Sequence, residues 1–266
     1  MTATKKQRLD LLMVERELAP TRAKAQALIM AGAVSIGGAT HSKAGTLVDP
    51  ATPIDVRSVL PYVGRGGLKL AHALHTFGLN PHGRVALDVG ACTGGFTDVL
   101  VQRGAARVYA VDVGYGQLDW SLRQNERVVV IERTNIRYLE FLPVAADGAP
   151  VLADCGVVDV SFISLALVLP AMRRLLQPTS WIVALIKPQF EAGHELVGKG
   201  GIVRDPAVHR LVLEHVTTAA ARHGLATLGL TRSPITGAEG NIEFLAHFAP
   251  AEPNDVEPLI AALFDD

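Results

Sequence analysis

Short apolar runs alternate with longer amphipathic stretches between residues 67 and 248. Apolar runs bounded by turn residues predict strands buried on both faces, and the stretches between them have the spacing of one helix face. We expect strands at 84–90, 107–113, 128–131, 154–160, 180–186, 225–232 and 242–248, and helices that include 67–77, 96–102, 164–176 and 205–223. Strands that alternate with helices predict an α/β protein with a parallel sheet and right-handed crossovers.

The first sixty residues have a different pattern. Apolar residues at helical spacing begin at Leu9, and Pro20 should end that helix. Thr21 can cap a second helix, which Gly32 closes. Short strands are expected near 34–36, 47–48 and 54–56, with a hairpin turn at 37–38. We therefore divide the chain into a small α+β domain at 1–60, a linker at 61–66 and a larger α/β domain at 67–266.

Composition narrows the class of protein. A chain of 266 residues has room for one full domain and a small one. Its 49% hydrophobic and 5% aromatic residues suit an α/β protein better than a disordered or fibrous one. No apolar run is long enough to span a bilayer, and the first residues lack a secretory signal. Two cysteines are too few for a disulfide framework, and no metal spacing is present, so we expect a cytoplasmic protein without structural metal.

Charge is distributed unevenly along the chain. Residues 1–70 hold ten Lys or Arg and five Asp or Glu, a net charge of +5, whereas the remainder carries −6. A basic N-terminal part, here called the head, followed by an acidic remainder, the body, indicates that the head binds a polyanion. An ordinary solvated surface explains the charge alone equally well. The basic residues that we expect to contact a polyanion are Lys6, Arg8, Arg22, Lys24, Lys43 and Arg65.

A glycine-rich turn follows the strand that contains Asp88. Glycine lets the backbone approach a ligand at the carboxyl end of a strand. A dinucleotide site needs a glycine where this chain has Cys92, so the turn suits an adenosine cofactor without phosphates better than NAD. Asp112 ends the next strand, where a carboxylate can accept both ribose hydroxyls. A plain strand-to-helix turn is the alternative interpretation.

Four charged residues stand beside apolar runs. Asp159 and Lys187 each follow a buried strand, Glu243 lies at the start of the last strand, and Lys69 lies near the start of a helix. Charges next to buried strands are costly unless they are paired, so we expect the two lysines and two acids to converge. Taken singly, Lys69 could be a solvated helix lysine and Glu243 a surface residue on an edge strand.

Residues 5–60 resemble a small RNA-binding domain first seen in ribosomal small-subunit protein four. The resemblance rests on Arg8-Leu9-Asp10, on the segment 21–25, on Leu28-Ile29 and on the glycines at 37–38. In that family two helices and a hairpin form a basic surface that holds structured RNA. The resemblance therefore implies that the head binds RNA.

Six motifs along the chain, in the same order, closely resemble the TlyA family. They lie at 64–70, 88–96, 159–165, 186–191, 198–201 and 240–244. The family, historically labelled hemolysins, combines the RNA-binding head with an FtsJ-like methyltransferase domain. It implies a Rossmann-like fold with a seven-stranded sheet whose last strand is antiparallel. It also implies 2′-O-methylation of cytidine in ribosomal RNA of the small subunit, the large subunit or both, with S-adenosyl-L-methionine as cofactor and no membrane partner.

The resemblance also implies roles for single residues. The family's Lys-Asp-Lys-Glu tetrad falls on Lys69, Asp159, Lys187 and Glu243. Lys187 would be the general base, for which a lysine needs a lowered pKa from burial or a neighbouring cation such as Lys69. Asp159 would steady Lys187 and Glu243 would orient the pair. The residues expected around the cofactor are Asp88, Gly90, Cys92, Gly94, Gly95 and Phe96 at the methionine and ribose, Asp112 at the ribose hydroxyls, and Asn135 and Ile136 at the adenine.

Three other functions remain open from the sequence. A membrane-lytic protein fits the historical name but lacks a spanning segment and a signal. A non-catalytic ribosome-binding assembly factor would retain the cofactor fold without the chemistry, which transfer of labelled methyl to ribosomal RNA would test. An NAD-dependent oxidoreductase is disfavoured by Cys92.

Overall fold

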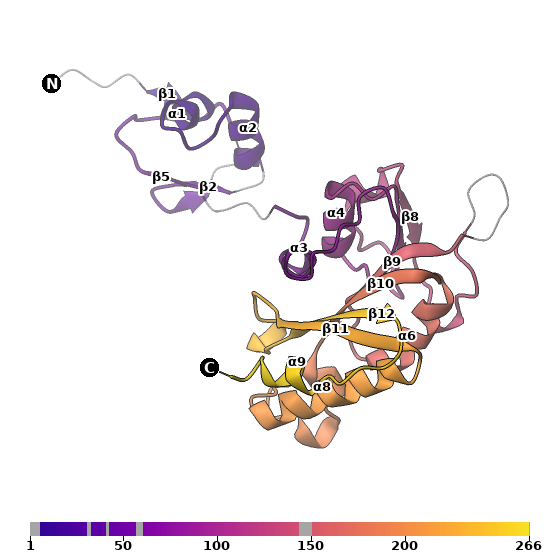
Figure 1. Cartoon of the computed structure of the whole chain (residues 1–266). Coiled ribbons are helices and arrows are strands. Elements are labelled where there is room, and N and C mark those ends of the chain that lie inside the picture. The colour runs from indigo at the N-terminus through magenta and orange to yellow at the C-terminus, as the bar shows by residue number, and fades with distance from the viewer. Residues whose placement is uncertain (1–5, 31–32, 41–42, 57–60, 144–150, 266) are drawn as a thin grey trace. The chain divides into compact units, whose positions relative to one another are not determined.

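The computed structural model describes residues 6–30, 33–40, 43–56, 61–143 and 151–265 (Figure 1). The chain forms two compact units, Met1–Leu60 and Pro61–Asp266. We describe each unit separately and call them the head and the body.

Within the described residues of the body, seven strands form one sheet in the order β11-β12-β10-β9-β6-β7-β8. Their bounds are β6 Val85–Val89, β7 Arg107–Val111, β8 Val128–Ile131, β9 Ala153–Val158, β10 Leu176–Ile186, β11 Leu225–Arg232 and β12 Phe244–Pro250. Adjacent strands from β10 to β8 are parallel, whereas β12 runs antiparallel to both β10 and β11. The predicted fold class is confirmed.

Helices cover both faces of this sheet (Figure 1). They are α3 Gly66–Thr76, α4 Gly95–Gln102, α5 Trp120–Arg123, α6 Leu165–Arg174, α7 Pro188–Glu191, α8 Pro206–Ala221 and α9 Glu257–Ala261. Alternate residues of one strand enter different hydrophobic clusters, because successive side chains point to opposite faces. Leu87 joins the cluster that contains α6 and α8, whereas Ala86 joins the cluster that contains α3 and α4.

The strand β10 departs furthest from its predicted bounds. The apolar run predicted a strand at 180–186, but β10 begins at Leu176. Its pairing with β9 changes register between Leu176 and Trp181, around Pro178 and its polar neighbours. Those residues carry no apolar signal, so the extra strand residues could not be read from hydrophobicity.

The head contains β1 Gln7–Arg8, α1 Leu9–Glu15, α2 Arg22–Met30, β2 Val34–Ile36, β3 Ala39–Thr40, β4 Leu47–Val48 and β5 Ile54–Val56. Its strands form two small sheets, β1-β4 and β3-β2-β5. Leu9, Met13 and Ile29 are fully buried in its core. The first helix ends at Glu15, earlier than expected, because Glu17 takes a left-handed conformation with φ of 58° before Pro20 is reached.

Candidate functional site

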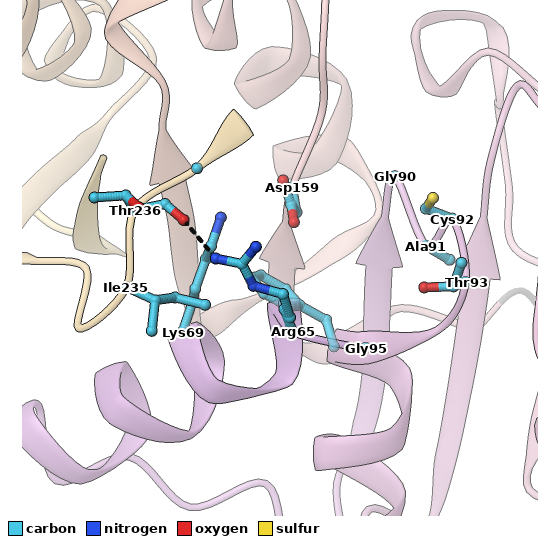
Figure 2. A pocket seen from close by; sticks show the side chains of 13 residues that line it. Arg65, Lys69, Gly90, Ala91, Cys92, Thr93, Gly95, Asp159, Ile235 and Thr236 are labelled. Carbon is cyan, nitrogen blue, oxygen red and sulfur yellow. Dashed lines mark hydrogen bonds between the residues drawn. The ribbon is translucent and has the colours of Figure 1, made fainter. Parts of the chain in front are cut away.

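Two cavities open at the carboxyl ends of β6, β7 and β9, where open α/β sheets bind ligands. The first, of about 350 Å³, is lined by Lys69, Arg65 and residues of the glycine turn, and we call it the Lys69 cavity (Figure 2). The second, of about 540 Å³, is lined by Asp112, and we call it the Asp112 cavity. Gly90, Cys92 and Asp159 line both cavities, so the two adjoin at the end of β6.

The four charged residues singled out in the sequence form two ion pairs. Lys187 Nζ lies 2.6 Å from Asp159 Oδ1 and also donates to Ser161 Oγ at 2.9 Å. Lys69 Nζ pairs with Glu243 Oε2, and these two residues are only 8% and 2% exposed. Lys69 and Asp159 line the same cavity, so both pairs lie beside it. Pairing removes most of the penalty of burying these charges.

The last strand brings Glu243 into the interior of the body. Glu243 directly precedes β12, which lies between β10 and β11. The interpretation of Glu243 as an exposed residue on an edge strand is therefore wrong. The loop before it also makes room for the carboxylate, because a Cβ on Gly237 would overlap Glu243 Oε1. Ile235, Thr236 and Gly237 line the Lys69 cavity but gave no signal in the sequence, since none of them is charged.

The glycine turn presses against the Asp159 loop. Gly90 has φ of 81°, and a Cβ there would overlap the backbone carbonyl of Asp159. Only glycine fits both the conformation and the space. Gly94, with φ of 99°, instead faces the Leu122 side chain and lines neither cavity. Of the other expected cofactor residues, Gly95 and Phe96 line the Lys69 cavity.

Asp112 organises the Asp112 cavity. Its Oδ2 accepts from the Cys92 N–H at 2.8 Å, and its Oδ1 accepts from the Gly114 N–H at 2.6 Å. Carboxylate oxygens have further lone pairs, so these bonds fix the group and leave it able to accept ligand hydroxyls. Asn135 and Ile136, at the start of the short 3₁₀ helix η1 (Ile136–Tyr138), line the same cavity. These residues fit an adenosine group.

Asp88 lies beneath the two cavities and lines neither of them. It is completely buried, and its Oδ2 accepts from Thr97 Oγ at 2.6 Å. Its Oδ1 has no hydrogen-bond partner in the described part of the chain. Burial, reinforced by the neighbouring carboxylates of Asp159 and Asp112, raises the pKa of the Asp88 carboxyl to about 7.

This pKa predicts a pH-dependent stability. Between the unfolded and folded pKa values the native state binds more protons than the unfolded chain, so stability falls as pH rises from about 4 to about 7. The full effect corresponds to at most roughly 4 kcal/mol. We expect Asp88→Asn to raise the free energy of unfolding, relative to the unmodified chain, more at about pH 8 than at about pH 5. Urea unfolding at both pH values tests this, and an equal difference at both would contradict it.

Two loops that hold the charged residues are joined by three contacts. Lys187 reaches Asp159 and Ser161, and the rings of Phe162 and Phe190 lie 4.8 Å apart. Glu191 then accepts from Ser164 Oγ at 2.7 Å and from the Leu165 N–H at 2.8 Å, which caps α6. Glu191 thus adds a second polar link between the two loops, besides the ion pair of Lys187 with Asp159.

Phe162 is the least usual residue in these loops. It is 89% exposed and has φ of 63°, a conformation rare for an aromatic residue. It lines the Asp112 cavity together with Ser161. Ser161, Phe162 and Glu191 were quoted in the sequence motifs but given no role, because an uncharged residue or a second acid after a strand carries little signal alone.

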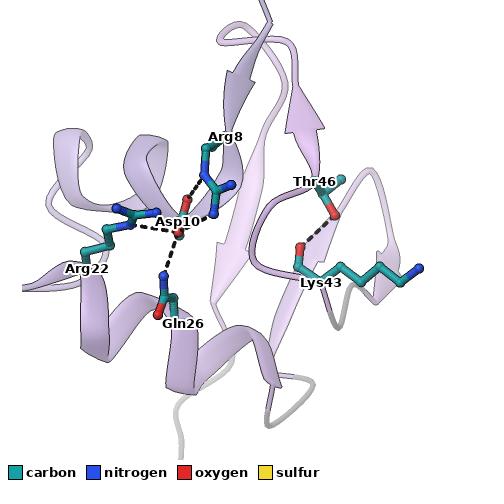
Figure 3. A network of polar contacts seen from close by, with 6 residues as sticks. All are labelled: Arg8, Asp10, Arg22, Gln26, Lys43 and Thr46. Atoms are coloured by element: carbon teal, nitrogen blue, oxygen red, sulfur yellow. Dashed lines mark hydrogen bonds and ion pairs between the residues drawn. The ribbon is translucent and has the colours of Figure 1, made fainter.

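The basic residues predicted to bind a polyanion are in different surroundings. Arg65 lies at the Lys69 cavity, where its Nη2 donates to the Thr236 carbonyl at 3.2 Å (Figure 2). Arg8 and Arg22 are ion-paired with Asp10 in the head (Figure 3). Lys6 and Lys43 are exposed, and the side chain of Lys24 lies outside the described part of the structure.

Two features are absent from the described residues. No helix there is both long and apolar enough to cross a membrane. No group of three or more His, Cys, Asp or Glu residues there is arranged to hold a metal ion.

Comparisons with known proteins follow the same division. The FtsJ-like methyltransferase family matches residues 62–249, and the S4 domain matches residues 7–54. The 16S/23S rRNA (cytidine-2′-O)-methyltransferase TlyA of Mycobacterium tuberculosis is 46% identical over 239 residues, which cover 89% of this chain and 87% of that protein. Hemolysin A of Brachyspira hyodysenteriae is 39% identical over 241 residues, covering 91% and 99%.

Solved structures agree with these relatives. A candidate hemolysin from Streptococcus thermophilus matches with a TM-score of 0.72 and 45% identity, covering 98% of this chain and 96% of the other. A candidate S-adenosylmethionine-dependent methyltransferase from Listeria monocytogenes matches with a TM-score of 0.51 and 14% identity, covering 71% of this chain and 100% of the other, which supports the fold alone. The chain therefore belongs to the TlyA family of FtsJ-like methyltransferases with an N-terminal S4 domain, a family that implies S-adenosylmethionine as cofactor.

Proposed function

We propose that this protein transfers a methyl group from S-adenosyl-L-methionine to the 2′-hydroxyl of a cytidine in ribosomal RNA. The substrate is inferred from the name of the Mycobacterium tuberculosis relative. One observation carries the chemistry: Asp159 lines both cavities and holds Lys187 at 2.6 Å, so a basic side chain is fixed where the two cavities adjoin. A charged pair between a cofactor cavity and a second cavity suits proton removal during group transfer.

The two cavities would divide the cofactor between them. Asp112 would accept the ribose hydroxyls, and Asn135 and Ile136 would contact the adenine. Gly90, Cys92, Gly95 and Phe96 would lie along the methionyl part, with Asp88 and Gly94 supporting the turn from below. S-adenosylmethionine supplies an electrophilic methyl group on a sulfonium. The carboxylate of Asp159, which lines both cavities, favours such a cation over a neutral ligand.

The side chains of the two ion pairs would handle the nucleophile. A ribose 2′-hydroxyl is a weak acid, so it must lose its proton as it attacks. We assign proton acceptance to the Lys187 amine, which Asp159 and Ser161 hold in a single orientation. Lys69 and Glu243, paired with each other, would shape the wall of the cavity that receives the ribose. In-line positioning would supply most of the acceleration.

Exposed Phe162 has a position suited to a base. A nucleotide whose ribose enters a cavity reaches further when its base leaves the RNA stack, and aromatic rings stabilise unstacked bases. Phe162 packs against Phe190, close to Lys187, and is open to solvent. We assign it contact with the target base.

Recognition of RNA is assigned to the head at 1–60 and chemistry to 67–266, with 61–66 between them. Any division of the chain should keep the residues from Pro61 with the body. Tyr62 and Val63 pack against the α3 and α4 cluster, and the Val63 N–H donates to Asp98 Oδ2 at 2.9 Å.

The proposed function is tested by methyl transfer from labelled S-adenosylmethionine. Small and large ribosomal subunits from cells without this gene should accept the label, and mass mapping should locate it on the 2′-oxygen of a cytidine. Label on a base, or none on either subunit, would refute the proposal. A purely structural ribosome-binding factor would bind the subunits and transfer nothing.

Cofactor choice gives a separate prediction. Calorimetry on the full chain should show binding of S-adenosylmethionine or S-adenosylhomocysteine and much weaker binding of NAD. Cys92 stands where a pyrophosphate would need glycine, whereas Asp112 could accept the ribose hydroxyls of either cofactor, so the discrimination rests on the turn at Cys92. Preferential binding of NAD would exclude the methyltransferase assignment of these cavities.

A further inference from the structure

One completely buried carboxylate joins two arginines in the head (Figure 3). Asp10 Oδ1 accepts from Arg8 Nε at 3.0 Å, and its Oδ2 accepts from Arg8 Nη2 and from Arg22 Nε, both at 2.9 Å. Gln26 Nε2 adds a further hydrogen bond at 2.8 Å. Asp10 is 0% exposed, whereas the Arg8 and Arg22 side chains remain 42% and 53% exposed.

The network connects three elements of the head. Arg8 belongs to β1, Asp10 to the first turn of α1, and Arg22 begins α2. Asp10 is therefore the point through which both guanidinium groups are fixed to the core. Arg8 also packs against the loop before β4, since a Cβ on Gly45 would lie 3.1 Å from its Nη1. The planar two-point bond from Arg8 leaves that side chain little freedom to rotate.

Each arginine keeps donors outside the network. Across the described residues, no hydrogen bond uses Arg8 Nη1 or either Nη of Arg22. Arginine presents five N–H donors, so both side chains can bind the carboxylate on one edge and a second anion on another. Both side chains are also partly exposed to solvent.

We propose that Asp10 is the positioning residue of a phosphate-binding site, in which it fixes Arg8 and Arg22 so that their free donors contact the phosphodiester backbone of RNA. This rests on the proposed function, in which the head binds ribosomal RNA. Lysines carry the same charge without this geometry, so the site differs from a diffuse basic surface. Long side chains lose conformational entropy when they are ordered. Here the two arginines lose it when the head folds, so it need not be lost again on binding.

For the removal of the Asp10 carboxylate, the proposal predicts a change in RNA affinity opposite to the one that charge alone would cause. A carboxylate beside a phosphate site repels the phosphate, so its removal should strengthen RNA binding if the arginines merely supply charge. If Asp10 positions them, its removal should weaken binding although the head becomes more positive. Asp10→Asn keeps the shape of the side chain and removes its charge. Asp55→Asn, at an exposed position of β5, removes the same charge elsewhere in the head and is the matched control.

The experiment measures the affinity of the full chain for isolated small and large ribosomal subunits at several salt concentrations. Asp10→Asn should weaken binding by about tenfold and make the dependence on salt shallower, since fewer phosphates are contacted. Asp55→Asn should leave the affinity unchanged or slightly raised. Equal or tighter binding by Asp10→Asn would overturn the proposal.

A double-mutant cycle separates positioning from general loss of structure. Once Arg8→Gln and Arg22→Gln are present, Asp10→Asn should have no further effect on affinity, because Asp10 acts through them. If circular dichroism shows that Asp10→Asn does not fold, Arg22→Lys is the alternative variant, since it keeps the positive charge and the Asp10 carboxylate. It should still weaken binding, because lysine lacks the planar, forked donor group of arginine. Normal affinity of Arg22→Lys would then overturn the proposal.

A failure of the proposed RNA recognition by the head would give a different result. If Arg8→Gln with Arg22→Gln binds the subunits normally, the head does not recognise RNA through these residues, and the proposed function loses its recognition step. If that pair weakens binding while Asp10→Asn does not, only the positioning role of Asp10 is refuted.

Discussion

Replacement of Lys187 by alanine should slow methyl transfer by about a hundredfold or more while cofactor affinity stays nearly unchanged. Lys187 Nζ contacts Asp159 and Ser161 beside the cavities, so its loss removes the proton acceptor and leaves the Asp112 cavity intact. Single-turnover rates with labelled S-adenosylmethionine measure the first effect, and calorimetry measures the second. A loss of cofactor binding would show instead that the variant disturbs the cavity.

Lys187→Arg is the informative companion variant. Arginine keeps the positive charge beside Asp159. Its side chain stays protonated in proteins, so it cannot accept a proton as a base. We expect Lys187→Arg to be nearly as slow as Lys187→Ala. Near-normal transfer by either variant would move the base elsewhere, with Lys69 as the next candidate.

Removal of the head should abolish most of the affinity for ribosomal subunits and leave the fold of the body intact. A chain that begins at Pro61 retains the whole sheet and the Tyr62 and Val63 contacts. It should bind S-adenosylmethionine like the full chain. Lys and Arg contacts to phosphate release counterions, so the affinity of the full chain should fall steeply with salt, and that of the body should fall less.

Charge reversal provides the control for this truncation. Glutamate at Lys24 and Lys43, combined with glutamine at Arg8 and Arg22 because glutamate there would face the buried Asp10, should reproduce the loss of subunit binding, by about a hundredfold or more at physiological salt, without a change in cofactor affinity. Filter binding at several salt concentrations measures both forms. If the body alone methylates ribosomal RNA as well as the full chain, recognition does not reside in the head.

Much of the fold could be predicted because its signals are local. All seven strands of the body overlap a predicted strand, since strands covered on both faces are mainly apolar. The glycine turn at Gly90 was predicted for the same kind of reason, because positive φ and close packing demand glycine there. The helices α5, α7 and α9 are too short to carry a periodic signal, and none was predicted.

The pairing of the charged residues depends on strand order, which local patterns do not encode. The sequence predicted that Lys69, Asp159, Lys187 and Glu243 converge, but not that Lys69 pairs with Glu243. That pair exists because β12 enters the sheet beside β10. The expected role of Lys69 as a cation for Lys187 stays a prediction. Glu191 was not assigned a role because its partners, Ser164 and Leu165, lie at the start of α6, in another part of the chain.

The place of β12 also sets the order in which the body can be completed during synthesis. The ion-pair partner of Lys69 lies 174 positions further along the chain. The strand that joins β10 to β11 is also synthesised after both of them. Until that strand emerges, β10 has an open edge, and contacts so distant in sequence form late. A nascent chain without β12 thus has neither the complete sheet nor Glu243 as the partner of Lys69. The site beside the Lys69 cavity is therefore assembled only after β12 has been synthesised.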